Sequence, residues 1–213
     1  MEQALRQLYA DIKQCHCDCP GERQGGGTVR DTGSPSAGIL LLGEAPVAEE
    51  IKRGVPFVGP AGINLDGFLQ LAGLTRDKVL ITNTVKCRPT KNQGRANRRP
   101  TACEIKSCAR WLDAELRLLS PPVLITLGDV ALKRLGGPAL RLAECHGRPL
   151  TLNGAAVIPM YHPAAIIYRR QLEPVLAADF TALGQILAGL PDRQNGYSDP
   201  VLGSTHSPGK QNY

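Results

Sequence analysis

Polar side chains that can grip a flat ring stand at the ends of short apolar runs in this sequence. Asn83 offers one donor and one acceptor, the pairing required by a base edge that carries one N–H and one C=O. His162 precedes Pro163, and a proline restricts the backbone before it and so helps to fix the direction of the imidazole. An asparagine is also common in turns, and a single histidine is more often structural than catalytic. The interpretation as a site therefore requires these side chains to meet.

The segment 43–62 follows the first apolar run and is rich in Gly and Pro. We predict a long loop here, and loops of this length inside a compact domain usually have a function. Gly43 would let the backbone approach a ligand closely. Phe57 lies between Pro and Gly residues, where a held aromatic ring suits stacking on a flat ligand. A loop-anchoring role for Phe57 is the competing interpretation.

The seven cysteines are clustered. The start of the chain has no basic segment followed by an apolar one, so we expect a cytoplasmic protein without a disulfide framework. Three cysteines lie within 15–19 among polar neighbours that are unsuited to a core, and three more lie within 87–108. This clustering indicates a metal or an iron–sulfur cluster, whereas Cys145 fits a small buried hydrophobe.

The chain is basic, with 25 Lys and Arg against 19 Asp and Glu. Six of the basic residues fall in a stretch without any acid: Lys86, Arg88, Lys91, Arg95, Arg98 and Arg99. Each contact of such a stretch with a phosphate releases counterions, which predicts salt-sensitive binding to nucleic acid. A solvated basic loop is the alternative.

The elements that would position these residues alternate along the chain. Apolar runs predict strands over 39–43, 78–83, 123–128 and 156–159, the last entered by a hairpin. Helices are predicted over 1–13, 63–74, 101–119, 130–135, 164–170 and 173–187, with Thr101 and Glu104 as a capping box. This order predicts an α/β domain with a mainly parallel sheet, whose ligands lie at the carboxyl ends of the strands. Glu44, Asn83, Gly128 and His162 would converge there.

The ends of the chain and its hydropathy set further expectations. No window approaches the ~20 consecutive apolar residues of a membrane span. The segment 191–213 is polar and rich in Gly, Ser, Pro and Asn, so we expect a disordered tail after a single domain over 1–190.

Four stretches together resemble the motifs of family 4 uracil-DNA glycosylases, the iron–sulfur members of their superfamily. They are Gly-Glu-Ala-Pro at 43–46, Gly-Val-Pro-Phe-Val-Gly-Pro-Ala-Gly at 54–62, Ile-Thr-Asn-Thr-Val-Lys-Cys-Arg-Pro at 81–89 and Tyr-His-Pro at 161–163. The resemblance implies a three-layer α/β/α sandwich around a four-stranded, mainly parallel sheet. It also implies base excision repair, in which uracil is flipped out of DNA and its N-glycosidic bond is hydrolysed.

The resemblance assigns roles to the substrate-binding residues. Uracil would stack on Phe57, and Asn83 would read O4 and N3–H. His162 would donate to O2 as negative charge develops on the departing base. Glu44 and Ala45, from the first motif, would complete the binding set.

The same resemblance suggests the remaining catalytic groups. Glu50 is the first candidate to hold water or to stabilise a cationic sugar, Glu44 is the second, and Asn92 contributes by motif match. A wedge into the space vacated by the base is assigned to residues 166–168. The expected partner is uracil-containing DNA, single- or double-stranded, bound by a monomer in a bacterial or archaeal cytoplasm.

The family implies a 4Fe–4S cluster held by four cysteines. Cys87 and Cys108 match two of its positions, and Cys103 is an alternate for the second. The family's Cys-x-x-Cys pair is not present in this chain. Cys19 stands at the expected distance before Gly43 and takes either Cys15 or Cys17 as its partner. We prefer Cys15, since positions four apart share a helical face.

Three departures from the family pattern bear on activity. Val47 and Ile51 stand where the family has Gly and Asp, and the basic stretch is longer than usual. If the backbone at 47 needed a positive φ, valine would obstruct it. The alternatives are therefore a protein of this fold that binds DNA or damaged bases without turnover, a relative that forms a covalent adduct, and a zinc protein that uses the same thiolates.

Overall fold

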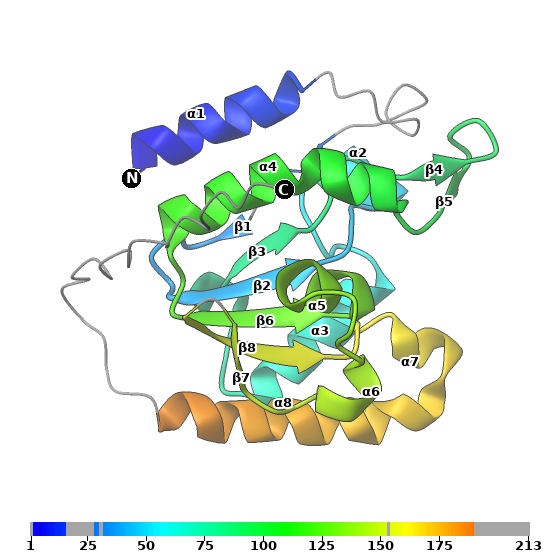
Figure 1. Cartoon of the computed structure of the whole chain (residues 1–213). Helices are drawn as coiled ribbons and strands as arrows, with labels where there is room; N and C mark the ends of the chain where they lie inside the picture. The colour runs from blue at the N-terminus through cyan, green and yellow to red at the C-terminus, as the bar shows by residue number, and fades with distance from the viewer. Residues whose placement is uncertain (1, 16–27, 30–31, 153, 190–213) are drawn as a thin grey trace, which may run out of the picture.

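The chain forms an α/β domain around one twisted sheet (Figure 1). The computed structural model describes residues 2–15, 28–29, 32–152 and 154–189. The sheet has six strands in the order β1-β3-β2-β6-β8-β7. Their bounds are β1 Thr32–Gly33, β2 Ile39–Gly43, β3 Leu80–Asn83, β6 Val123–Leu127, β7 Leu150–Leu152 and β8 Ala155–Met160.

The four inner strands are parallel, and the short strands β1 and β7 add antiparallel edges. The α/β class and the mainly parallel sheet are thus confirmed. The sheet has six strands rather than the four that we expected, because the two edge strands were not predicted as part of it. The inner strands are buried on both faces because helices cover both. Their residues alternate between two cores, so that Leu41 and Ile125 face one side while Leu40 and Leu124 face the other.

The helices form the two outer layers. Helices α3 (Pro60–Leu71) and α8 (Glu173–Ala188) pack together on one face of the sheet. Helices α4 (Ala102–Leu119) and α5 (Asp129–Gly136) cover the other face, and the amphipathic α1 (Glu2–Lys13) lies against α4. Thr101 and Glu104 form the predicted capping box of α4. None of the described helices is long and apolar enough to span a membrane.

Short elements cluster where the parallel strands end. They are α2 (Ala48–Arg53), the hairpin of β4 (Thr90–Lys91) and β5 (Ala96–Asn97), α6 (Leu142–Cys145), α7 (Ala165–Tyr168) and a 3-10 turn at Arg170–Leu172. A second 3-10 turn, Arg76–Lys78, lies at the opposite end of the sheet, just before β3. The prediction of a continuous loop over 43–62 is wrong, because α2 and the start of α3 occupy much of it. The predicted tail over 191–213 lies outside the described residues.

Candidate active site

The expected convergence at the carboxyl edge of the sheet is present. Gly43 at the end of β2 pairs in register with Asn83 at the end of β3, and Leu127 pairs with Met160. The segments that leave these strands run to α2, to α7 and to the β4–β5 hairpin, all at the same end of the sheet in Figure 1. The parallel register therefore brings the predicted side chains to one edge.

Gly43, Asn83 and Phe57 form the centre of the site. A Cβ on Gly43 would overlap Oδ1 of Asn83 and would lie 3.3 Å from the Phe57 ring. Glycine is required here by this close approach rather than by its backbone angles. Asn83 is buried, and its side-chain amide has no hydrogen bond to another residue in the part of the chain that the structure describes. It remains available to a ligand.

The backbone of Phe57 is held in an unusual conformation. Its φ is +53°, in the left-handed region that a bulky residue rarely adopts. The Phe57 N–H donates to Oε1 of Glu50 at 2.6 Å, and its carbonyl accepts from the Arg76 guanidinium at 2.6 Å. Arg76 also donates to the carbonyls of Pro56 and Gly62 and is paired with Asp66. The ring is therefore positioned by contacts to both of its flanking peptide groups.

Glu50 is occupied by the backbone rather than open to a reacting group. Its second carboxylate oxygen accepts from the Val47 N–H at 3.0 Å. Val47 is the N-cap of α2 and Glu50 is its N3 residue, so this bond caps the start of the helix. Burial raises the pKa of Glu50, and the two amide donors partly offset that effect. Its contacts are those of a positioning residue, and a role in holding water stays a prediction. Val47 has φ −111°, so valine is unstrained at this position.

His162 lies beside Phe57 with a defined tautomer. The two rings stack with centroids 5.5 Å apart and planes inclined by 24°. The backbone N–H of Ala164 donates to Nδ1 of His162 at 3.1 Å, so the proton of the neutral ring is on Nε2. Burial lowers the pKa of His162 to about 4. The site therefore holds a neutral imidazole that can donate from Nε2.

Of the two carboxylates Glu44 and Glu50, Glu44 is the one that is exposed to solvent in part. It is partly buried and lies 3.6 Å from the Arg99 guanidinium, which is also 3.7 Å from Asp129. The pKa of Glu44 is raised, mainly because the carboxyl group is buried. The positive charge of Arg99 opposes this shift, and the negative charge of Asp129 adds to it. Glu44 is thus better placed than Glu50 to meet a solvent molecule or a sugar. Ala45, the next residue, is half-buried.

Asn92 does not join this group. It lies at the exposed turn of the β4–β5 hairpin, with φ +53°. The sequence prediction missed Asn97, at the base of the same hairpin. Its Oδ1 accepts from Arg88 at 2.7 Å and from the Ala48 N–H at 3.3 Å, which ties the hairpin to the start of α2. Because the basic stretch is longer than in the family pattern, motif matching did not find this asparagine. The catalytic contribution of Asn92 stays a prediction.

The residues assigned to a wedge separate into two kinds. Ile166 packs against the core, whereas Ile167 and Tyr168 are exposed on α7, with 47% and 86% of their surfaces accessible. Only the latter two project from the molecule.

Four of the described cysteines lie on α4 or near it, whereas Cys145 ends α6. Cys15, just after α1, accepts from the Trp111 indole N–H at 3.2 Å, and Cys108 accepts from the Lys86 N–H at 3.1 Å. Cys87 directly follows Lys86, while Cys103 is exposed. Cys17 and Cys19 lie outside the described residues. Among the residues that are described, no three His, Cys, Asp or Glu side chains form a metal-binding group.

The chemistry of these contacts nevertheless suits an iron–sulfur cluster. N–H groups that donate to cysteine sulfur stabilise a thiolate, and such bonds surround the ligands of iron–sulfur centres. Cys15 and Cys108 both receive them, from an indole and from a backbone amide.

Comparison with known proteins agrees with this geometry. Residues 30–183 match the family described as the uracil DNA glycosylase superfamily. A protein named Type-4 uracil-DNA glycosylase from Sulfurisphaera tokodaii is 36% identical over 74% of this chain and 74% of its own. Proteins of the same name from Thermotoga maritima and Archaeoglobus fulgidus are 34% and 32% identical, over 81% and 86% of this chain and 88% and 94% of theirs.

Proposed function

This chain belongs to the uracil-DNA glycosylase superfamily, and from that premise we propose that it removes uracil from DNA by hydrolysing the N-glycosidic bond, the first step of base excision repair. The observation that supports this most directly is the meeting of Phe57, Asn83 and His162 at one edge of the sheet. An aromatic face, an amide and an imidazole are the groups that a flipped pyrimidine needs.

Recognition of the base follows from the chemistry of its edges. Uracil stacks on the Phe57 ring, and the free Asn83 amide accepts from N3–H and donates to O4. Cytosine presents an acceptor at N3 and a donor at position 4, so the same amide orientation is mismatched. Such a reversed pair leaves buried polar groups unsatisfied, which gives strong discrimination.

Cleavage of the glycosidic bond leaves negative charge on the base. The Nε2–H of His162 donates to uracil O2 as that charge grows. A neutral donor fixed before the reaction needs no reorganisation at the transition state. Glu44 orients the attacking water or stabilises the positive charge on the sugar, while Glu50 holds Phe57 and the start of α2 in place.

We propose the cluster as a structural cofactor. Its ligands are Cys87, Cys108, Cys19 and either Cys15 or Cys17. The hydrogen bond that Cys15 accepts from Trp111 favours Cys15 over Cys17. A 4Fe–4S cluster bound there supplies cross-links between distant segments. On this proposal the protein works as a monomer in the cytoplasm, on single- or double-stranded DNA.

The decisive experiment is strand cleavage after alkali treatment of uracil-containing oligonucleotides. We expect cleavage at uracil, none at cytosine, and a rate that falls about 100- to 1,000-fold in His162→Ala. Intact strands with retained DNA binding would indicate a protein without turnover, and a band that resists denaturing gel electrophoresis would indicate a covalent adduct. Val47→Gly, run in parallel, should match the wild type within a few fold because valine is unstrained there.

A second measurement identifies the metal. A brown protein with visible absorption indicates iron–sulfur, whereas a colourless protein with bound zinc supports the alternative. The two experiments are independent, so that a zinc-bound enzyme or an inactive iron–sulfur protein would each be recognised.

A further inference from the structure

The basic side chains of the stretch 86–99 fall into two groups in the structure. Three of them have partners inside the protein: Lys86 with Glu115, Arg88 with Asn97, and Arg98 with Glu104. These contacts remove half of the basic stretch from any role in binding DNA. The exposed remainder is Lys91, Arg95 and Arg99, of which Arg99 is near Glu44.

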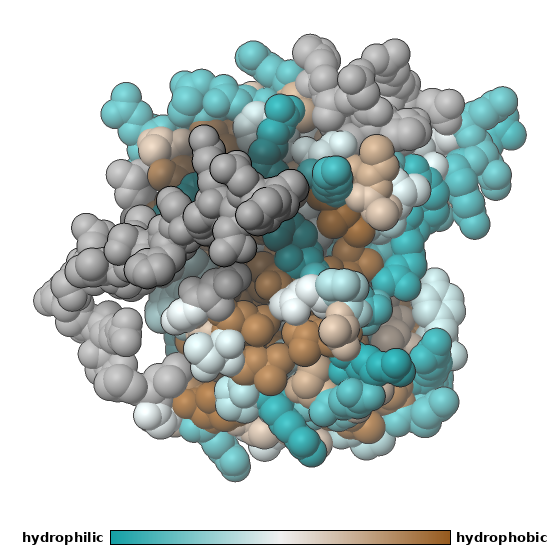
Figure 2. Space-filling model, viewed as in Figure 1, coloured by the Kyte–Doolittle hydropathy of each residue, from teal (hydrophilic) through white to brown (hydrophobic). Residues whose placement is uncertain are grey.

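Lys91 and Arg95 belong to the β4–β5 hairpin, which projects from the domain at the end where the site lies (Figures 1 and 2). In Figure 2 the surface at the place of this hairpin is coloured as hydrophilic. Its turn has three successive residues with positive φ, namely Asn92, Gln93 and Gly94. Within the described ranges, neither Lys91 nor Arg95 forms an ion pair. Two cations are therefore presented to solvent without a neutralising acid.

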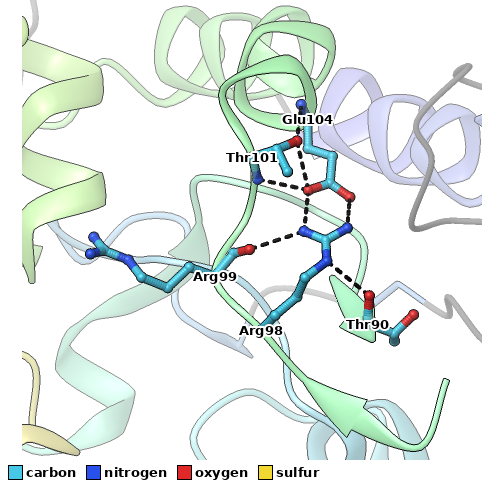
Figure 3. Close-up of polar contacts among 5 residues, drawn as sticks. All are labelled: Thr90, Arg98, Arg99, Thr101 and Glu104. Atoms are coloured by element: carbon cyan, nitrogen blue, oxygen red, sulfur yellow. Dashed lines mark hydrogen bonds and ion pairs between the residues drawn. The ribbon is translucent and has the colours of Figure 1, made fainter. Parts of the chain in front are cut away.

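The hairpin is braced at its base rather than loosely attached. Arg98 donates from Nε to the Thr90 carbonyl and makes two bonds to the Glu104 carboxylate, which in turn caps α4 (Figure 3). On its other side Asn97 ties the hairpin to α2. A cation on a braced arm loses less conformational freedom when it binds than one on a free loop.

We propose that the β4–β5 hairpin is a DNA-backbone arm, in which Lys91 and Arg95 contact phosphates flanking the flipped nucleotide. The proposal rests on the proposed function for its substrate. Arg99 lies beside Glu44, and Arg95 stands four positions before it, which in extended chain is a span of roughly 13 Å. At about 3.4 Å per base pair this reach equals about four base pairs. The arm would contact only one side of the lesion.

The first test measures binding to duplex DNA without uracil as a function of salt. We expect Lys91→Gln/Arg95→Gln to reduce the slope of log K against log salt by about 1.8, since each phosphate contact contributes about 0.9. The affinity lost between 50 and 200 mM salt should then be about 12-fold smaller than for the wild type. The matched control is Lys78→Gln/Arg117→Gln, which removes two exposed cations at the opposite, amino-terminal end of the strands.

The two pairs of substitutions remove the same net charge. An unchanged slope in the hairpin variant, or an equal change in both variants, overturns the proposal, because the effect would then be absent or merely one of overall charge. Unfolding curves that match the wild type show that the hairpin variant is folded, as expected for exposed side chains. Because the DNA lacks uracil, this result stands whether or not the protein cleaves.

The second test locates the arm with uracil-containing duplexes shortened on one side of the lesion. We expect the difference between the wild type and the hairpin variant to disappear when one flank falls below about four base pairs, and to persist when only the other is shortened. Equal behaviour of the two flanks overturns the one-sided placement. A wild-type protein that fails to cleave any of these duplexes refutes the proposed function but leaves the salt result intact.

Discussion

At the scale of single residues, the tautomer of His162 is the feature on which the chemistry depends. We predict that its ring stays neutral with the proton on Nε2 from pH 8 to pH 5, because burial lowers its pKa to about 4 and the Ala164 N–H occupies Nδ1. Nitrogen NMR of labelled imidazole would show this directly. A ring that titrates near pH 6.5, or that carries its proton on Nδ1, would contradict the assignment.

The same lowered pKa has a consequence for stability. Between about pH 6.5 and pH 4 the unfolded chain binds a proton at this histidine that the folded chain does not, so the contribution of His162 lowers the free energy of unfolding as the pH falls. Above pH 6.5 the contribution is constant. Denaturant titrations of wild type and His162→Gln across this range should show a smaller pH slope in the variant.

Arg76 is predicted to matter through Phe57 without touching the base. Arg76→Ala removes the donors to three carbonyls that keep Phe57 in its left-handed conformation. We expect single-turnover cleavage to slow by up to about 100-fold, as a misplacement of about 1 Å can do, while binding to uracil-free DNA is unchanged. Arg76→Lys should recover part of the rate. Lys78→Ala, on the same 3-10 turn, is the control; an equal loss of rate and of DNA affinity in Arg76→Ala would contradict the positioning role.

Several residue positions could be predicted from the sequence because chain direction and parallel register determine them. Asn83 and His162 each end or follow an inner strand, so knowledge of the strands was sufficient to bring them together. The contacts of Glu50 could not be foreseen, because they depend on the path of the backbone between α2 and α3. The same holds for Arg76, whose partners lie up to 20 positions away in the chain.

At the scale of elements, the Arg98–Glu104 pair should stabilise both the hairpin and α4. Arg98 is the main cause that lowers the pKa of Glu104 to about 2. Glu104→Gln should reduce the free energy of unfolding by about 2 to 4 kcal/mol, through loss of the charge-assisted bonds between Arg98 and a buried carboxylate. The measure is chemical denaturation. Glu49→Gln, in the exposed pair with Arg53, should cost less than about 1 kcal/mol.

The pH dependence of this pair has a definite sign. Its stabilisation is complete above the ordinary pKa of a glutamate, near 4.5, and is lost as the pH falls towards 2. Glu104→Gln should therefore differ from the wild type at pH 7 and converge with it at low pH. A difference that is constant over this range would mean that the carboxylate charge is not the source of the stability.

The elements were predictable where a local signal specified them. The capping box at Thr101 marked the start of α4, and the apolar runs marked the four inner strands. Helix α2 was missed although acids lie in its first turn, bases in its last, and Gly54 follows with φ +69°. Six residues are too few to show a clear helical periodicity, and the Gly and Pro residues around them favoured the prediction of a loop. The two-residue strands of the hairpin have no period at all.

At the scale of the whole molecule, the proposed cluster would join segments that the sheet does not connect. Cys87 and Cys108 stand at the two ends of the segment that contains the hairpin, and Cys15 ends the α1 region that packs on α4. The inner strands and α3 pack without any of these cysteines. The molecule thus has two parts. One is the sheet, at whose edge Phe57, Asn83 and His162 lie. The other, called the flank here, consists of α1 and residues 87–108, which the cluster would join.

Removal of the cluster should therefore affect the two parts differently. After oxidative loss of iron, we expect amide hydrogen exchange to accelerate in α1 and in residues 87–100, with little change in β6 and β8, whose hydrogen bonds lie within the sheet. DNA affinity should fall more than the single-turnover rate at saturating protein, since the flank carries the exposed cations and the sheet carries the site. Uniform acceleration would mean that the cluster supports the whole fold, and no change in α1 would mean that Cys15 does not tie it to the cluster.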